Sequence, residues 1–318
     1  MHVLTFNSHQ SYIHLLATSL PWTIGVVLPR LPSGKVKSWD VRIRPSPDNV
    51  RLYSSTEEAL KDSSWHWVLA HNVHDLIDCR VIPLPKICLV HGTLSGRILQ
   101  DGSTIDRTSY LDSLRVLLDA NRCAVVYISR LKQDDWGIPG TVIRSAIDPS
   151  QYGGYVGDRR GVLQVCNHLR ERGRLLGWET FQSVCRGLPT LVMGENHGLS
   201  VSRAADSWDD LKEQYRQWRI YLYTAVFPHE DGYNLALLEA MATGMPVATI
   251  AHPTSPVRDG VEGVVSSTAA ELRERVIGLL DDPEEAHRMG CAARTTLERE
   301  FPISQFRDSW HQLAEKLG

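Results

Sequence analysis

The chain has 318 residues, of which 42% are hydrophobic and 22% charged, and 34 lysine and arginine residues against 37 aspartate and glutamate residues give a net charge of −3. This length fits two domains of about 150 residues each better than one. The balance of charges gives no reason to expect a nucleic-acid partner, and no apolar run approaches the ~18–20 residues that span a bilayer.

The N-terminal residues MHVLTFNSHQSYIHLL are typical of a first β-strand that enters a helix. They lack a charged n-region and a long apolar core, so we expect no signal peptide. The six cysteines are scattered without a C-x-x-C pair, which predicts neither a zinc site nor a disulfide framework and favours a reducing compartment. We therefore expect a cytoplasmic protein. Peripheral contact with the inner face of a membrane stays open.

The first half alternates short β-rich runs with helical stretches, a pattern typical of a parallel sheet covered by helices. Its predicted strands cover residues 2–6, 22–28, 50–53, 65–70, 87–91, 124–128 and 141–143, and its predicted helices cover residues 11–18, 56–62 and 108–121. Residues 30–49 are rich in Pro, Ser, Lys and Arg and predict a long surface loop. Five basic residues of this loop surround Trp39. They favour a solvated loop, or else contact with an anionic acceptor or a membrane surface.

The alternation stops at residues 147–160, where several glycines, one proline and no periodicity indicate an interdomain hinge. It then resumes, which predicts an α/β protein of two Rossmann-like domains. The predicted strands of the second half cover residues 162–165, 190–193, 220–224, 246–250 and 263–266, and the predicted helices cover residues 173–186, 208–217, 234–243, 269–280, 283–300 and 303–317.

Residues 228–267 carry the most chemical information. Asp231 and Gly232 directly precede a predicted helix, whose unpaired N–H groups and positive dipole end suit a phosphate. The helix, NLALLEAMAT, is apolar almost all round and should be buried. Glu239 is its one charge, and a buried carboxylate costs free energy unless it is hydrogen-bonded. The two hydroxyl groups of a ribose would supply such bonds.

The spacing of the two acids supports a sugar nucleotide as the ligand. On a continuous helix, eight residues correspond to ~12 Å along the axis and a rotation of ~80°. Asp231 would then face the sugar end of the ligand and Glu239 its ribose end. The alternative is that Glu239 pairs with a core arginine and that Asp231 merely caps the helix.

This segment resembles a known family. Residues 231–247, DGYNLALLEAMATGMPV, are similar to the E-x7-E region of retaining GT-B glycosyltransferases of family 4, the "group 1" class, whose usual form is EGFGLxxLEAMAxGxPV. The resemblance implies two Rossmann-like domains that face each other across a cleft. Residues 1–150 would form the acceptor domain, residues 151–302 the donor domain, and residues 303–318 a terminal helix that crosses back to the first domain.

The resemblance also implies roles in donor binding. Glu239 would bind the donor ribose, and Asp231, which replaces the family's first glutamate, would lie by the donor sugar. Whether Asp231 or its neighbour Glu230 reaches the sugar stays open. Gly232 opens the helix start, and the family's donor sugar and phosphates lie near the backbone N–H groups at three further positions, here Tyr233, Asn234 and Leu235.

A second segment, VLQVCNHLRERG at residues 162–173, resembles the family's strand followed by V-G-R-L-x3-K-G. Arg172 takes the place of the lysine and would neutralise the pyrophosphate. Asn167 takes the place of the arginine, and Arg170 is a candidate substitute for the missing charge. The alternative is that these arginines form a solvated helix start.

Histidines end two predicted strands of the first half, in WHWVLAHN and KICLVHG. Open α/β sheets bind ligands at the carboxyl ends of their strands. The resemblance implies a histidine near the donor sugar, so we assign His71 a catalytic role and His91 to the acceptor. His9, in the loop after the first strand, is a weaker acceptor candidate. The alternative for each is an ordinary hydrogen-bonded histidine.

The predicted activity is that of a retaining hexosyltransferase, which moves a sugar from a nucleoside diphosphate sugar to an acceptor hydroxyl. Asp231, His71 and Arg172 are its predicted catalytic residues. No D-x-D motif ends a strand, so we expect no metal and no cofactor besides a UDP- or GDP-sugar as co-substrate. The acceptor would be a glycan, a lipid-linked molecule or a small molecule. A non-catalytic GT-B-like sugar-nucleotide-binding protein and a nucleotide-sugar epimerase stay open as alternatives.

Overall fold

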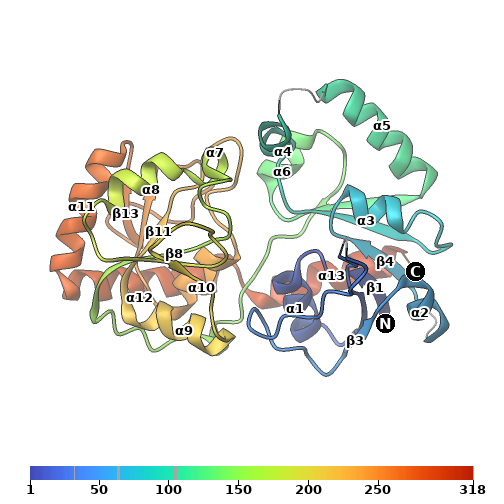
Figure 1. The fold of residues 1–318 in the computed structure, drawn as a ribbon, viewed down its shortest axis with the longest axis horizontal. Helices are drawn as coiled ribbons and strands as arrows, with labels where there is room; N and C mark the ends of the chain where they lie inside the picture. The colour runs from blue at the N-terminus through green and yellow to red at the C-terminus, as the bar shows by residue number, and fades with distance from the viewer. Residues whose placement is uncertain (32, 63–64, 103–105, 318) are drawn as a thin grey trace. The chain divides into compact units, whose positions relative to one another are not determined.

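A computed structural model of the chain describes residues 1–31, 33–62, 65–102 and 106–317. The chain divides into two compact units (Figure 1). The first comprises Met1–Leu94, Ser103–Arg144 and Ser304–Gly318, and the second comprises Ser95–Gly102 and Ser145–Ile303. Each unit is built on one parallel β-sheet, so the predicted α/β class with two Rossmann-like sheets is confirmed.

The sheet of the first unit has seven parallel strands in the order β3-β2-β1-β4-β5-β6-β7. The strands are β1 (His2–Phe6), β2 (Thr23–Val27), β3 (Val50–Tyr53), β4 (Trp67–Ala70), β5 (Lys86–Val90), β6 (Cys123–Tyr127) and β7 (Thr141–Val142). The strand order reverses between β1 and β4, which is where open sheets of this kind bind ligands. All seven strands were predicted from the sequence to within two residues at each end.

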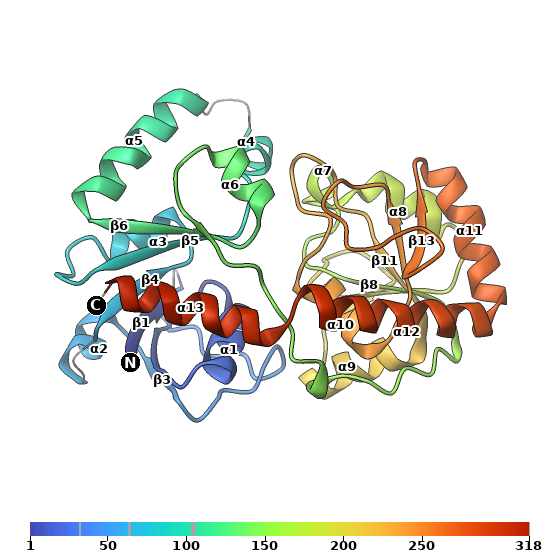
Figure 2. The same cartoon turned by 180° about the vertical axis from the view of Figure 1, so that it is seen from behind.

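Helices cover this sheet, and the last of them is the C-terminal helix of the chain. They are α1 (Gln10–Ser19), α2 (Thr56–Asp62), α3 (Val73–Asp78), α5 (Arg107–Ala120), α6 (Arg130–Trp136) and α13 (Ile303–Leu317). Figure 2 shows α13 lying along the sheet at β1 and β4. Trp310 of α13 is fully buried. Its ring is stacked on that of Trp67 with centroids 6.3 Å apart, so Trp310 anchors this helix on the first unit.

The loop at residues 30–49 forms no strand or helix in its described residues, which exclude Pro32. Trp39 is buried, and its indole N–H donates a 2.8 Å hydrogen bond to the carbonyl oxygen of Arg44. The tryptophan therefore holds the loop together from inside.

No helix in the described part of the chain has the length and apolar character that a membrane span requires.

The sheet of the second unit has six parallel strands in the order β10-β9-β8-β11-β12-β13. They are β8 (Arg159–Val165), β9 (Thr190–Met193), β10 (Ser202–Arg203), β11 (Trp218–Tyr223), β12 (Val247–Ile250) and β13 (Gly263–Ser266). The helices are α4 (Leu94–Asp101), α7 (Gly173–Leu176), α8 (Trp178–Cys185), α9 (Trp208–Gln217), α10 (Leu235–Thr243), α11 (Ala269–Asp281) and α12 (Pro283–Glu300), with a 3-10 turn at Pro149–Gln151. The strand order reverses between β8 and β11.

The single helix predicted over residues 173–186 is wrong, because the structure breaks it into α7 and α8 at Gly177. This residue has a φ of 70°, and a Cβ atom there would lie 2.1 Å from the carbonyl oxygen of Thr224. Only glycine tolerates both the left-handed conformation and the close approach of the neighbouring backbone.

Two apolar cores lie on the two faces of this sheet. One contains buried side chains of α9, α10 and α12, and the other contains those of α8, α11 and the first part of α12. Figure 1 shows α9 and α10 on one side of the sheet and α8 on the other. All residues of α10 from Leu237 to Thr243 are buried. The prediction that this apolar helix is buried is therefore confirmed, and its first turn lies beside the strand reversal.

Candidate active site

Two loops of the second unit meet at the carboxyl edge of its sheet. One follows β8 and holds Asn167, Arg170 and Arg172, and the other follows β11 and holds Asp231. Because β8 and β11 are adjacent and parallel, both loops leave the sheet at the same edge. This edge is at the strand reversal, where parallel α/β sheets bind nucleotides.

The start of α10 is built by Asn234. This residue is the N-cap, in an extended conformation, and its side-chain oxygen accepts a 2.9 Å hydrogen bond from the N–H group of Leu237. The first turn leaves the N–H groups of Leu235 and Ala236 without an acceptor inside the helix. These groups and the positive end of the helix dipole favour an anion here.

Two inferences about Asp231 are corrected by this cap. Asp231 does not cap the helix, because Asn234 does. The estimate of an axial distance between Asp231 and Glu239 also fails, because residues 231–234 precede the helix. Asp231 is nevertheless buried, with 1% of its surface exposed, and its carbonyl oxygen accepts a 2.9 Å hydrogen bond from the hydroxyl group of Tyr223. Burial raises the pKa of Tyr223 well above its usual value, so this hydroxyl group remains a donor.

Gly232 is required for close packing. A Cβ atom at Gly232 would lie 2.6 Å from the backbone nitrogen of Ser255 and 2.7 Å from Nδ1 of His252. The N–H group of Gly232 donates a 2.8 Å hydrogen bond to the hydroxyl oxygen of Thr254. The glycine therefore lets the loop after β12 lie directly against the loop after β11.

Glu239 lies in the middle of α10, with only 2% of its surface exposed. Its carboxylate accepts a 3.1 Å hydrogen bond from the hydroxyl group of Tyr215 on α9, a residue that the sequence did not single out. Burial, with a smaller contribution from the charge of Glu239, raises the pKa of the neighbouring Tyr221 well above its usual value. The carboxylate is thus held among aromatic side chains of the core.

The arginines after β8 differ in their surroundings. Arg172 is half-buried and precedes α7 as its N-cap residue, whereas the guanidinium group of Arg170 lies 5.2 Å from the ring centre of Trp178. Neither arginine forms an ion pair with a carboxylate among the described residues. Asn167 is engaged locally, since its side-chain oxygen accepts a 2.8 Å hydrogen bond from the N–H group of Glu195.

The three predicted histidines come together in the first unit. His9 is the N-cap residue of α1, and His71 and His91 directly follow β4 and β5. Nδ1 of His71 lies 2.9 Å from Nε2 of His91 in a hydrogen bond. The rings of His9 and His91 are stacked with centroids 3.9 Å apart. Among the described residues, no group of three or more His, Cys, Asp or Glu side chains is placed to hold a metal ion.

Burial keeps two of these histidines neutral. The loss of water around His71 lowers its pKa well below the usual value, and the nearby His9 adds to the effect. Burial also lowers the pKa of His91 well below the usual value, and the nearby His9 and His71 add to the effect. Asp75, which sequence reasoning missed, accepts 2.9 Å hydrogen bonds from the backbone N–H group of His71 and from the hydroxyl group of Ser8.

Comparison with known protein families gives one match, within the second unit. Residues 200–296, which include Asp231 and Glu239, match the family model described as glycosyl transferases group 1. No curated protein matches the chain in sequence.

Solved structures resemble the whole chain. Sucrose-phosphate synthase from Thermosynechococcus elongatus has a TM-score of 0.70 at 13% identity, over 100% of this chain and 99% of its own. HepE from Anabaena in complex with UDP and glucose has a TM-score of 0.67 at 13% identity, over 100% of both chains. WaaG, a glycosyltransferase involved in lipopolysaccharide biosynthesis, has a TM-score of 0.62 at 13% identity, over 100% of this chain and 99% of its own. These similarities confirm the predicted GT-B fold.

Proposed function

We propose a specific reaction for this chain, which carries a group 1 glycosyltransferase domain in residues 200–296 on a GT-B fold. It moves a sugar from a nucleoside diphosphate sugar to an acceptor hydroxyl group, with retention of the anomeric configuration and without a metal ion. The second unit binds the donor and the first unit binds the acceptor. The reaction takes place in the cytoplasm, and the acceptor is a glycan, a lipid-linked molecule or a small molecule.

The observation that carries this proposal is the start of α10. Asn234 caps a helix whose first N–H groups lack an acceptor within the helix. The buried Asp231 precedes this cap in the same loop, and the buried Glu239 follows about one turn into the helix. An anionic diphosphate fits the helix start, and a ribose fits a carboxylate that accepts its hydroxyl groups. In this proposal Glu239 binds the ribose and Asp231 orients the sugar. The N–H groups of Tyr233, Asn234 and Leu235 surround the sugar and the phosphates, and Gly232 leaves the approach to them open.

Positive charge near the leaving diphosphate would replace a metal ion. The transition state of glycosyl transfer resembles an oxocarbenium ion, so catalysis needs the departing phosphate to be stabilised. Arg172 and Arg170, on the loop after β8, provide that charge beside the helix dipole. Asn167, on the same loop, adds a neutral amide that binds the donor. The departing phosphate itself accepts the proton of the acceptor hydroxyl group.

The histidines of the first unit take the second substrate. His71 contacts the donor sugar during transfer, and His91 and His9 bind the acceptor. Support comes from their position at the strand reversal of the first sheet, where ligands bind in open α/β folds. Neutral imidazoles both donate and accept hydrogen bonds, which suits hydroxyl groups.

Thermal unfolding with a panel of donors tests this function. A ligand that binds the folded state raises the melting temperature. The structures of HepE hold UDP, UDP with glucose, and UDP-glucose, so UDP-sugars come first, followed by GDP-, ADP- and dTDP-sugars. We expect at least one to raise Tm, and Glu239→Ala to reduce the rise. Glu274→Ala, at an exposed position on α11, is the matched control and should respond like the wild type.

Turnover separates an enzyme from a binding protein. Release of the nucleoside diphosphate from the bound donor, with or without candidate acceptors, is expected of a transferase. Stable binding without release under any acceptor would contradict catalysis and leave a sugar-nucleotide-binding protein.

A further inference from the structure

The loop after β12 is hydrogen-bonded to the peptide groups on both sides of Asp231. Nε2 of His252 lies 3.0 Å from the carbonyl oxygen of Glu230, and Nδ1 of His252 lies 3.2 Å from the backbone nitrogen of Thr254. A carbonyl oxygen only accepts hydrogen bonds, so Nε2 carries the proton and Nδ1 accepts. These contacts define a neutral imidazole with a single tautomer.

Thr254 extends the same chain of hydrogen bonds. Its hydroxyl oxygen accepts a 2.8 Å bond from the N–H group of Gly232 and lies 3.2 Å from Nδ1 of His252, to which it donates. The resulting sequence of bonds runs from the N–H group of Gly232 through Thr254 and His252 to the carbonyl group of Glu230.

Side chains therefore hold the backbone of three successive residues. His252 binds the carbonyl group of Glu230, Tyr223 binds that of Asp231, and Thr254 binds the N–H group of Gly232. A loop with one backbone polar group fixed at each of three successive residues has fewer alternative conformations. Asp231 is at the centre of this restraint, although none of these three bonds involves its carboxylate.

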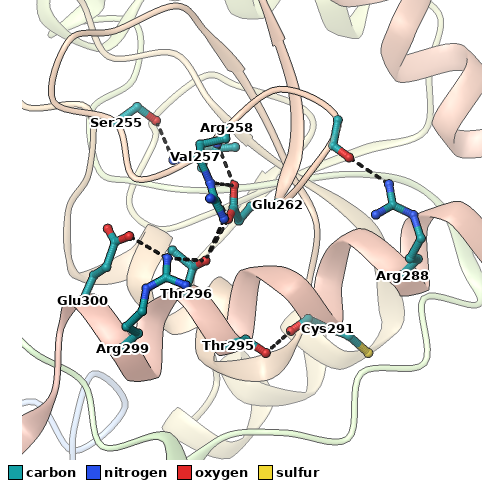
Figure 3. Close-up of polar contacts among 11 residues, drawn as sticks. Ser255, Val257, Arg258, Glu262, Arg288, Cys291, Thr295, Thr296, Arg299 and Glu300 are labelled. Carbon is teal, nitrogen blue, oxygen red and sulfur yellow. Dashed lines mark hydrogen bonds and ion pairs between the residues drawn. The ribbon is translucent and has the colours of Figure 1, made fainter.

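The far end of the same loop is fixed by a buried acid (Figure 3). Glu262 has no exposed surface, forms an ion pair with Arg258, and accepts a 2.7 Å hydrogen bond from the hydroxyl group of Thr296 on α12. The backbone N–H group of Arg258 also donates to Glu262, at 2.7 Å. The loop from His252 to Glu262 is thus attached to α12 at one end and to the Asp231 segment at the other.

We propose that His252 and Thr254 are positioning residues that hold Asp231 in place for the donor sugar. This inference rests on the proposed function and adds two residues to it. Neither residue needs to contact the donor. Because Asp231 faces the sugar and Glu239 the ribose, loss of the restraint should weaken the binding of a sugar nucleotide more than that of the nucleoside diphosphate alone.

Substitution of Thr254 tests this inference in the full chain. Thr254→Val keeps the shape and removes the hydroxyl group, whereas Thr254→Ser keeps the hydroxyl group. Thr295→Val is the control on α12, where the exposed Thr295 hydroxyl group donates a hydrogen bond within its own helix, to the carbonyl oxygen of Cys291 (Figure 3). Two properties are measured: amide hydrogen exchange of Gly232 by NMR, and the calorimetric affinities for UDP-glucose and for UDP.

In Thr254→Val we expect faster exchange at Gly232 and an affinity for UDP-glucose about fivefold lower, as for the loss of one hydrogen bond. The affinity for UDP should change by less than about twofold. Thr254→Ser and Thr295→Val should match the wild type in both properties.

Three results would overturn the inference. Unchanged amide exchange at Gly232 in Thr254→Val would show that Thr254 does not restrain this backbone. Faster exchange with an unchanged affinity for UDP-glucose would show that the restraint does not help to place the sugar. Faster exchange with equal losses of affinity for UDP and for UDP-glucose would show the same. If another donor of the thermal-unfolding panel binds in place of UDP-glucose, the same comparison is made with that donor and its own nucleoside diphosphate. A wild type that binds none of the four donors would contradict the proposed function as well, and that result is recognised before any variant is compared.

Discussion

The hydroxyl group of Tyr215 donates a 3.1 Å hydrogen bond to the carboxylate of Glu239, between the packed helices α9 and α10. A tyrosine satisfies part of the hydrogen-bonding capacity of a buried carboxylate without cancelling its charge. Glu239 thereby remains an acceptor of the kind that the hydroxyl groups of a ribose require. The same bond fixes the side chain in the apolar core of the second unit.

Tyr215→Phe should lower the free energy of unfolding by about 1 kcal/mol, because a buried acceptor loses one donor. Tyr221→Phe is the matched control, since the buried hydroxyl group of Tyr221 meets no hydrogen-bond partner among the described residues. Urea denaturation of both variants measures the difference. Equal losses in the two variants would contradict a structural role for the bond to Glu239.

Asn234→Ala should lower the free energy of unfolding by about 1 kcal/mol, because α10 loses its N-cap. Asn234→Ser keeps a capping oxygen and should retain most of the stability. Chemical denaturation at neutral pH compares the two. An alanine variant as stable as the serine variant would show that the cap does not stabilise the helix.

The stability of the protein should fall as the pH drops below about 6.5, the usual pKa of histidine. Burial lowers the pKa of His71 in the folded state, so below pH ~6.5 the unfolded state binds more protons and stability decreases with acidity. His71→Asn should weaken this dependence between pH 7.5 and 5.5. The exposed His74, in the same unit, provides the control His74→Asn. An identical pH slope in His71→Asn and the wild type would contradict a buried neutral His71.

Glu262→Gln should destabilise the protein at pH 7 by about 2 kcal/mol, the scale of charged hydrogen bonds lost at a buried carboxylate. Solvent around the exposed part of Arg258 limits the effect. Burial alone would raise the pKa of Glu262, but hydrogen bonds from Arg258 and Thr296 outweigh it and hold the pKa below its usual value.

The stabilisation by ionised Glu262 is therefore complete above pH ~4.5 and is lost as the pH falls through the folded-state pKa. The difference between the wild type and Glu262→Gln should shrink on acidification below that pH. Denaturation at pH 7 and pH 4 measures it, with the exposed Glu271→Gln as control. A difference that grows with acidity would contradict this account.

Local signals explain how far the sequence could predict the fold. The alternation of β-rich and helical runs located every strand except β10, which has two residues. The helices α3, α4 and α6 were missed, although Asn72 caps α3 and Ser129 caps α6. The break at Gly177 was missed because its cause is a neighbouring strand, at Thr224, and such contacts are not encoded locally.

The same distinction holds for the site. Glu239 was found because a charge interrupts an apolar helix, and the histidines because they end strands. Tyr215 could not be found, since it is 24 residues away in sequence and approaches Glu239 only through the packing of α9 on α10. His252 and Thr254 lie in a loop without periodicity, and only the close approach of Gly232 connects them to the donor segment.

Calorimetric titration of UDP-glucose, and then of the other three donors, into the wild type and Glu239→Ala tests the central claim most directly. We predict that one of these donors binds the wild type. We also predict that Glu239→Ala, folded to the same extent, binds that donor at least about tenfold more weakly, as expected for charged hydrogen bonds to a ribose. Equal affinities, or a wild type that binds none of the four, would contradict Glu239 as the residue that binds the ribose.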